Sequence, residues 1–262
     1  MTGATTGRVT LVGGGPGTDD LLTVAAVRAL AEADVVLYDR LAPHTQLAAH
    51  APNAELIDVG KRPGHHAIPQ SEIEALIVAH AESGAHVVRL KGGDPYVLGR
   101  GSEEVLACHR AGIPVEVVPG VTSAVAVPAA AGIPLTHRGV SHLFTVVSGH
   151  APLTESELEH LAGLGGTIVV LMGVGALPAL TAGLVRAGLD ADLPVAIIER
   201  GFQPDQRTTT GTLADIVGAA GRAHVSSPAV VVVGEVVRLA HDGEADSLAL
   251  IDRAARLAAV FP

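Results

Sequence analysis

The sequence contains little of what several common functional sites are built from. Its 262 residues include a single cysteine, Cys108, no tryptophan and only 2% aromatic residues. One cysteine permits no internal disulfide and suits a reducing compartment, and its place in a helical pattern favours a packing role. The scarcity of aromatic side chains leaves no stacking platform for single-stranded nucleic acid, and a net charge of −10 opposes broad nucleic-acid affinity. We expect neither a metal site nor a nucleic-acid partner.

Targeting and membrane signals are also absent from the printed sequence. The N-terminus, "MTGATTGR", lacks the basic and apolar regions of a signal peptide, and no uncharged apolar run reaches membrane-spanning length. There is no G-x-S-x-G elbow and no P-loop, which disfavours serine hydrolysis and nucleotide hydrolysis. These features predict a cytoplasmic protein with no membrane partner.

The pattern of apolar segments predicts an α/β fold with two domains. From residue 9 to residue 118, short β-branched runs alternate with longer segments of helical periodicity, as is typical of a mainly parallel sheet. After Pro134 a polar stretch leads to further strand candidates, among them an exposed "RTTTG" run that is typical of an antiparallel strand. We expect an N-terminal α/β domain with a mainly parallel sheet over residues 1–136 and a C-terminal α/β domain with a mixed sheet over residues 137–262.

The first strand candidate leads into a glycine-rich turn, "VTLVGGGPGTDDLL". Glycines in such a turn let the backbone lie close to a ligand, and Asp39 follows at about the 20-residue spacing of a ribose-binding acid. A dinucleotide fingerprint requires G-x-G-x-x-G, whereas counting from Gly13 puts Thr18 at the third glycine position. Pro16 also removes an N–H that a phosphate would need. A nicotinamide-dependent oxidoreductase remains an alternative on these residues alone.

Basic residues gather where the predicted strands of the first domain end, at the edge of a parallel sheet where ligands bind. A cationic crevice in an acidic protein suits a polyanionic small ligand. The turn Gly92–Gly93–Asp94–Pro95 offers glycine backbones that can approach a ligand and a carboxylate that accepts from hydroxyl groups. The basic residues at these ends are both lysines of the sequence, Lys61 and Lys91, together with Arg40, Arg62, Arg89 and Arg100.

Several segments together resemble the uroporphyrinogen-III C-methyltransferases of the tetrapyrrole methylase superfamily. They are "VGGGPGTDDLLTVAAVRALAEADVVLYDRL", "GKRPGHHAIPQSEI", "VVRLKGGDPYVLGRGSEE", "VPGVTSAVAVPAAAGIPLTHR" and "VSGH", in order and spacing. The resemblance extends from about residue 9 to residue 239. It implies two α/β domains with S-adenosylmethionine in the cleft between them, and a homodimer.

The resemblance also implies roles for individual residues. Asp39 and Lys61 match the proton acceptor and proton donor proposed for the family. Arg200 and Phe202 stand in "ERGF" where the family often has "ENGT", a departure from the family pattern that keeps Gly201. Ser123 stands where alanine is common. The residues implied to contact S-adenosylmethionine are Pro16, Gly92, Gly93, Asp94, Val97, Thr122 and Ser123 in the first domain, and Met172, Gly201 and Ala229 in the second.

The reaction implied is the successive transfer of two methyl groups from S-adenosylmethionine to two ring carbons of uroporphyrinogen III. The products are precorrin-2 and two molecules of S-adenosylhomocysteine, in sirohaem or cobalamin biosynthesis. Because this tetrapyrrole is a polycarboxylate, we expect arginines to bind it. Alternatives are a sister methylase acting on a later corrinoid and a non-catalytic tetrapyrrole carrier. The expected carboxylate partners are Arg40, Arg62, Arg100 and Arg138.

Overall fold

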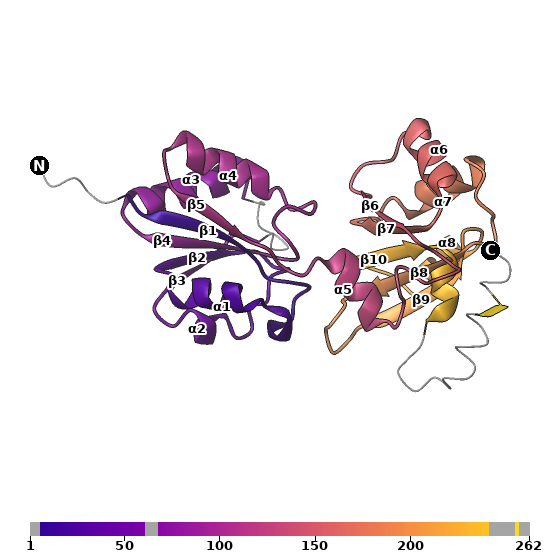
Figure 1. The fold of residues 1–262 in the computed structure, drawn as a ribbon, viewed down its shortest axis with the longest axis horizontal. Helices are drawn as coiled ribbons and strands as arrows, with labels where there is room; N and C mark the ends of the chain where they lie inside the picture. The colour runs from indigo at the N-terminus through magenta and orange to yellow at the C-terminus, as the bar shows by residue number, and fades with distance from the viewer. Residues whose placement is uncertain (1–5, 61–67, 241–254, 257–262) are drawn as a thin grey trace, which may run out of the picture. The chain divides into compact units, whose positions relative to one another are not determined.

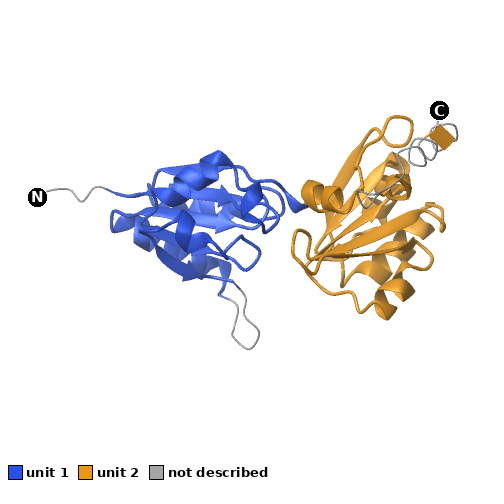
Figure 2. Cartoon of the chain, turned by 90° about the horizontal axis from the view of Figure 1, so that it is seen from below, with its two compact units in different colours: residues 1–123 blue, residues 124–262 orange. Residues whose placement is uncertain are grey.

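The chain forms two α/β units, and the computed structural model describes residues 6–60, 68–240 and 255–256. Contacts divide the chain into residues 1–123 and residues 124–262, coloured separately in Figure 2. Each unit is built around one five-stranded sheet. The predicted fold class of two α/β domains is confirmed.

The first unit is a parallel sheet covered by helices on both faces, as Figure 1 shows. All four strand pairings are parallel, and the strand order is β3-β2-β4-β1-β5. The strands are β1 (Arg8–Gly13), β2 (Val35–Tyr38), β3 (Glu55–Asp58), β4 (His86–Lys91) and β5 (Val115–Val118). The helices are α1 (Val24–Ala31), α2 (Leu47–His50), α3 (Gln70–Glu82) and α4 (Gly101–Arg110), with a 3-10 turn η1 (Asp19–Leu21).

Alternation along each strand divides the apolar side chains between two cores, because successive side chains point to opposite faces of a sheet. On β4, Val87 packs beneath α3 and α4, whereas Val88 and Leu90 pack beneath α1 and α2. Cys108 is fully buried in the α3–α4 core, and this burial raises the pKa of its thiol to about 11. The packing role predicted for this cysteine is confirmed.

The second unit contains a mixed sheet of order β6-β7-β10-β8-β9. Strands β6 and β7 are parallel and the other three pairings are antiparallel. The "RTTTG" run lies on β9, antiparallel to β8, as predicted. The strands are β6 (Phe144–Ser148), β7 (Thr167–Leu171), β8 (Pro194–Glu199), β9 (Arg207–Thr212) and β10 (Ala229–Val233). The helices are α5 (Ser123–Ala130), α6 (Glu155–Leu164), α7 (Leu177–Arg186) and α8 (Ile216–Arg222), with a 3-10 turn η2 (Glu235–Leu239).

The observed division between the units lies at residues 123/124, earlier in the chain than the predicted 136/137. Helix α5 accounts for the difference. Its Ala124 and Val127 are buried with Val169, Ala196 and other strand residues of the second unit. The sequence pattern placed this helix with the parallel sheet that precedes it, because apolar residues alone do not show which sheet a helix covers.

Candidate functional site

The carboxyl ends of the parallel strands in the first unit are joined by close backbone contacts between glycines. Gly13 ends β1, Gly93 follows β4 and Gly120 follows β5. A Cβ on Gly120 would lie 2.3 Å from the carbonyl oxygen of Gly93 and 2.6 Å from Cα of Gly13. The N–H of Gly93 donates to the carbonyl of Gly15 at 2.6 Å, and the N–H of Gly15 donates back at 3.1 Å. Side chains are therefore excluded at Gly13 and Gly120, and backbone groups line this edge.

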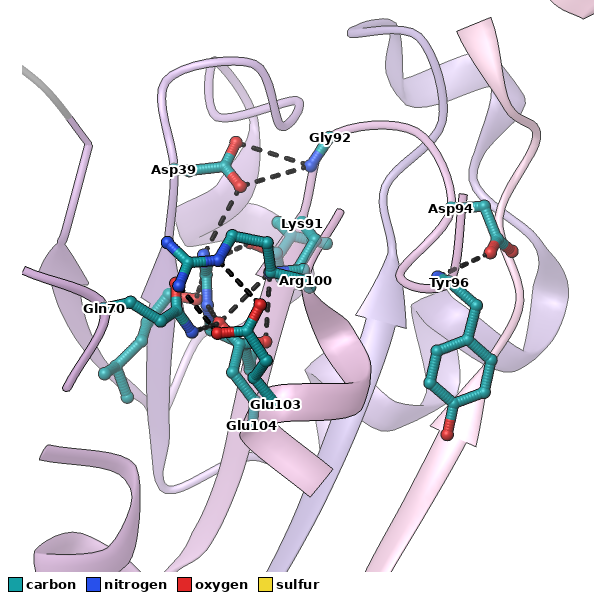
Figure 3. A network of polar contacts seen from close by, with 12 residues as sticks. Asp39, Gln70, Lys91, Gly92, Asp94, Tyr96, Arg100, Glu103 and Glu104 are labelled. Atoms are coloured by element: carbon teal, nitrogen blue, oxygen red, sulfur yellow. Dashed lines mark hydrogen bonds and ion pairs between the residues drawn. The ribbon is translucent and has the colours of Figure 1, made fainter. Parts of the chain in front are cut away.

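Asp94 fixes the turn that follows β4. One carboxylate oxygen accepts from the N–H of Tyr96 at 2.8 Å, shown in Figure 3, and the other accepts from the N–H of Gly120 at 3.0 Å. The Val97 N–H donates to the Asp94 carbonyl at 3.3 Å. Asp94 thus joins the ends of β4 and β5. A hydrogen bond to a ligand would have to use the remaining lone pairs of this carboxylate.

Asp39, directly after β2, is held by backbone donors. Its Oδ1 accepts from the N–H groups of Leu41 at 3.0 Å and Ala42 at 3.1 Å. The backbone nitrogen of Gly92 lies 3.3 Å from Oδ1 and 3.4 Å from Oδ2. Figure 3 draws both contacts as dashed lines. The side chain is 28% exposed. The predicted catalytic carboxylate therefore lies beside the predicted cofactor turn and remains accessible to a ligand.

A buried group of charges lies beneath Asp39 on the α3–α4 face of the sheet. Glu104 of α4 is fully buried, and its Oε1 accepts from Nε of Arg89 and from Nζ of Lys91, both at 3.1 Å. Gln70 of α3 donates to the same oxygen at 3.2 Å. Burial and the Arg89 charge lower the pKa of Lys91, against the opposing effect of Glu104.

The prediction of an open cationic crevice is wrong for Arg89 and Lys91. Both side chains are almost completely buried and paired with Glu104. The physical reason is that burying an isolated charge costs a large free energy, so the buried carboxylate of Glu104 is paired with neighbouring cations. The sequence offered one signal for this network, since Arg89 and Lys91 occupy alternate positions on a strand whose one other residue on that face, Val87, is apolar.

The arginines predicted to bind substrate lie in different settings. Arg40 and Arg138 are exposed, and neither side chain has an ion pair with another described residue. Arg100 precedes α4 and donates to Glu103 at 2.8 and 2.6 Å, so a substrate carboxylate would compete with that pair. Lys61 and Arg62 lie outside the described residues.

The other predicted cofactor residues of the first unit lie near the glycine contacts. Pro16 follows Gly15 directly, while Thr122 and Ser123 come shortly after Gly120. All three residues are partly exposed. The structure therefore brings the predicted first-unit residues, except those outside the described part, to one edge of the sheet. Gly120 was not among the predicted site residues, although its position after a strand signalled it.

In the second unit, the predicted cofactor residues follow or begin neighbouring strands. Met172 follows β7, is 48% exposed as a residue and has a φ of 58°. Gly201 follows β8 and is buried, and a Cβ there would lie 2.6 Å from a methyl carbon of Val127. Ala229 begins β10, in register with Glu199 of β8. The close approach of Val127 explains why glycine is required at position 201.

The "ERGF" segment, which departs from the family pattern, is anchored by the fully buried Glu199. Burial acts to raise the pKa of this carboxyl, but hydrogen bonds from Arg207 and the Ser226 N–H, with the nearby guanidinium charges, hold it below its usual value. The Ser226 N–H donates at 2.9 Å, and Arg200 donates at 3.2 Å. Arg200 also pairs with Asp205 at 2.6 Å. Arg200 therefore holds the backbone that carries Gly201.

Replacing Glu199 with glutamine is expected to destabilise the second unit by about 1.5–3 kcal/mol, because charge-assisted hydrogen bonds are lost inside the unit. The lowered pKa means that the ionised group stabilises the fold fully above the usual carboxyl pKa, and that this contribution disappears as the pH falls through the lowered value. Thermal unfolding midpoints at several pH values measure the effect. The difference between wild type and variant should shrink in acid.

Glu155→Gln provides the control, because Glu155 pairs with Arg186 on the surface of the same unit, where both side chains are more than half exposed. Exposed pairs contribute at most about 1 kcal/mol. An equal decrease of the thermal unfolding midpoint in Glu199→Gln and Glu155→Gln would contradict the role assigned to Glu199.

Among the described residues, no helix has the length and apolarity to cross a bilayer. That same part of the chain contains no cluster of three or more His, Cys, Asp or Glu side chains placed to hold a metal ion.

Comparison with known proteins gives a consistent result. The family described as Tetrapyrrole (Corrin/Porphyrin) Methylases matches residues 8–217. The S-adenosyl-L-methionine-dependent uroporphyrinogen III methyltransferase of Methanosarcina barkeri is 49% identical over 240 residues, which are 90% of this chain and 94% of that protein. A siroheme synthase of Gluconacetobacter diazotrophicus is 49% identical over 91% of this chain but only 52% of its own length. The chain thus spans about half of that longer relative.

A similar solved structure is that of the uroporphyrin-III C-methyl transferase from Thermus thermophilus complexed with S-adenyl homocysteine. It is 46% identical, with a TM-score of 0.75, and the alignment covers 89% of this chain and 100% of that one.

Proposed function

Because the chain belongs to the tetrapyrrole methylase family, we propose that it transfers two methyl groups from S-adenosylmethionine to uroporphyrinogen III and so forms precorrin-2 and S-adenosylhomocysteine. One observation carries this proposal: the chain matches 94% of a relative named for S-adenosylmethionine-dependent methylation of uroporphyrinogen III, at 49% identity. The product serves sirohaem or cobalamin synthesis.

The edge of the first sheet suits the cofactor. When bound, S-adenosylmethionine supplies an electrophilic methyl group, and the main work of the protein is to align it with the attacking ring carbon. Gly93 has a φ of 70°, and a Cβ there would have no heavy atom closer than 3.8 Å, so the turn leaves space beside its backbone. We assign cofactor contacts to Pro16, Gly92, Gly93, Asp94, Val97, Thr122 and Ser123 in the first unit, and to Met172, Gly201 and Ala229 in the second.

Asp39 is the proposed catalytic carboxylate. Positive charge develops on the macrocycle as a ring carbon is methylated, and a proton must then leave. The Asp39 oxygens accept from three backbone N–H groups and are fixed in orientation, which suits stabilisation of that charge and acceptance of the proton. Lys61 remains the proposed proton donor.

Arginines are the proposed ligands of the substrate carboxylates, because a guanidinium group can bind a carboxylate through two hydrogen bonds. Arg40 and Arg138 are exposed and available, and Arg100 would exchange its contact with Glu103 for one with substrate. Arg62 completes the proposed set. We also propose a cytoplasmic homodimer, on the basis of the family resemblance, and light scattering of the purified chain tests the dimer.

A substrate comparison tests the proposed function. The purified chain is incubated with methyl-labelled S-adenosylmethionine and either uroporphyrinogen III or a later corrinoid. Label is expected on uroporphyrinogen III. Label found only on the corrinoid would indicate a sister methylase. Tetrapyrrole binding without transfer would indicate a carrier, and nicotinamide-dependent absorbance changes would favour an oxidoreductase.

A further inference from the structure

Asp39 is connected to the interior of the first unit through the side chain of Arg89. The guanidinium Nη2 of Arg89 lies 3.5 Å from Oδ2 of Asp39, while its Nε donates to Glu104 at 3.1 Å. Its Nη1 donates to the carbonyls of Leu37 at 3.3 Å and Leu90 at 2.8 Å. All three nitrogens of the guanidinium thus have partners, which lie on β2, β4 and α4 and at Asp39 directly after β2. The guanidinium is therefore fixed in orientation between Asp39 and Glu104.

Two acidic side chains contact Arg89 among the described residues, Glu104 and Asp39. Arg89 and Lys91 carry two positive charges, and Glu104 provides one buried negative charge against them. Asp39 is the second acidic side chain and is 28% exposed. Figure 3 labels it together with Lys91 and Glu104. Arg89 is therefore the buried cation that contacts both Glu104 inside the group and Asp39 at its accessible end.

Stability alone does not explain why these charges are buried. Desolvation offsets most of the attraction within a buried ion pair, and apolar residues of similar volume are often at least as stabilising. The odd-numbered residues of β4 change from the apolar Val87 to the charged Arg89 and Lys91 toward the carboxyl end of the strand. Asp39 and Gly92 lie at that same edge of the sheet. The charges are thus placed where they act on the candidate site.

We propose that Arg89 is a positioning residue that holds the Asp39 carboxylate in its orientation for methyl transfer. This inference rests on the proposed function and on the role assigned to Asp39. Lysine cannot replace arginine here, because an ammonium group lacks the planar fork that bridges two carboxylates and two carbonyls. Lys91 shares the Glu104 partner but has no hydrogen bond to Asp39 among the described residues.

A double-mutant cycle between Arg89→Lys and Asp39→Asn tests the proposal in the full chain. Arg89→Lys keeps the buried charge and is expected to lower kcat about tenfold or more, with KM for uroporphyrinogen III changed less than about threefold. In the Asp39→Asn background the same substitution should lower kcat no further, because Arg89 acts through that carboxylate. If the double variant loses kcat by the product of the two single-variant factors, the two residues act independently and the proposal is overturned.

Lys91→Met is the matched control. It disturbs the same buried carboxylate, so thermal stability should change, but kcat is expected to stay within about threefold of wild type. A loss of kcat equal to that of Arg89→Lys would overturn the specific role of Arg89. Should Arg89→Lys fail to fold, the double variant Arg89→Gln, Asp39→Asn removes one charge of each sign. It is expected to match Asp39→Asn in turnover, and slower turnover would count against the proposal.

Hydrogen exchange at the Gly92 amide, which donates to Asp39, provides a measurement that does not depend on turnover. Exchange should be faster in Arg89→Lys than in Lys91→Met. Equal exchange in the two variants would overturn the positioning role. A wild-type chain that transfers no methyl group to uroporphyrinogen III would refute the proposed function instead, so the two failures are distinguishable.

Discussion

Gly120→Ala is expected to weaken binding of S-adenosylhomocysteine by about 10- to 100-fold. The added Cβ would lie 2.3 to 2.6 Å from backbone atoms of Gly93 and Gly13, none of which can rotate away. Forced overpacking typically costs about 1–3 kcal/mol, and each 1.4 kcal/mol is a tenfold change in affinity. The turn after β4 must move, and the proposed cofactor contacts move with it. Isothermal titration calorimetry measures the loss.

Gly112→Ala controls for a general loss of stability in the same unit. Gly112 has a φ of 69° with no neighbouring atom within 4 Å of a Cβ, so alanine there adds backbone strain of about 1–2 kcal/mol without a clash. Its affinity for S-adenosylhomocysteine should remain that of wild type. If Gly120→Ala and Gly112→Ala bind the cofactor product equally well, the glycine contacts do not shape the cofactor site.

Asp39→Asn is expected to lower kcat by about 10²- to 10⁴-fold, the range in which a positioned proton acceptor contributes. The amide oxygen can still accept from the N–H groups of Leu41, Ala42 and Gly92, so the local backbone should be kept while the charge is lost. Affinity for S-adenosylhomocysteine is therefore expected to change little. Single-turnover methyl transfer measures the chemical step.

Asp39→Ala separates the charge from the structural contact. Alanine also removes the acceptor for the Gly92 N–H, so this variant should lose cofactor affinity in addition to turnover. An Asp39→Asn variant with wild-type turnover would remove Asp39 from the catalytic role, whatever the alanine variant did.

The strands were predictable because β-branched runs covered on both faces give a strong local pattern. The parallel first sheet and the mixed second sheet follow from the spacing of those runs and from the polar "RTTTG" strand. The order of the strands and the membership of α5 depend on long-range packing. Val127, for example, belongs to the second core through contacts that its own segment does not encode.

Parts of the candidate site could be predicted where the residue types favour one local structure, as glycine and aspartate favour a tight turn. Gly93 and Asp94 formed the expected turn beside the strand ends. The charged residues were harder to interpret, since Arg89 and Lys91 have the same chemistry whether they bind a ligand or neutralise Glu104. Only the burial of Glu104, which lies more than ten residues further along the chain, decides between these uses.

The number of methyl groups added to each macrocycle tests the central claim most directly. The full chain is incubated with uroporphyrinogen III and excess S-adenosylmethionine, and the tetrapyrrole products are followed by mass spectrometry over time. A monomethylated species should rise and then be consumed, leaving a dimethylated product with two molecules of S-adenosylhomocysteine for each macrocycle. Uroporphyrinogen III that remains unmethylated, or a reaction that stops after a single methyl group, would contradict the account.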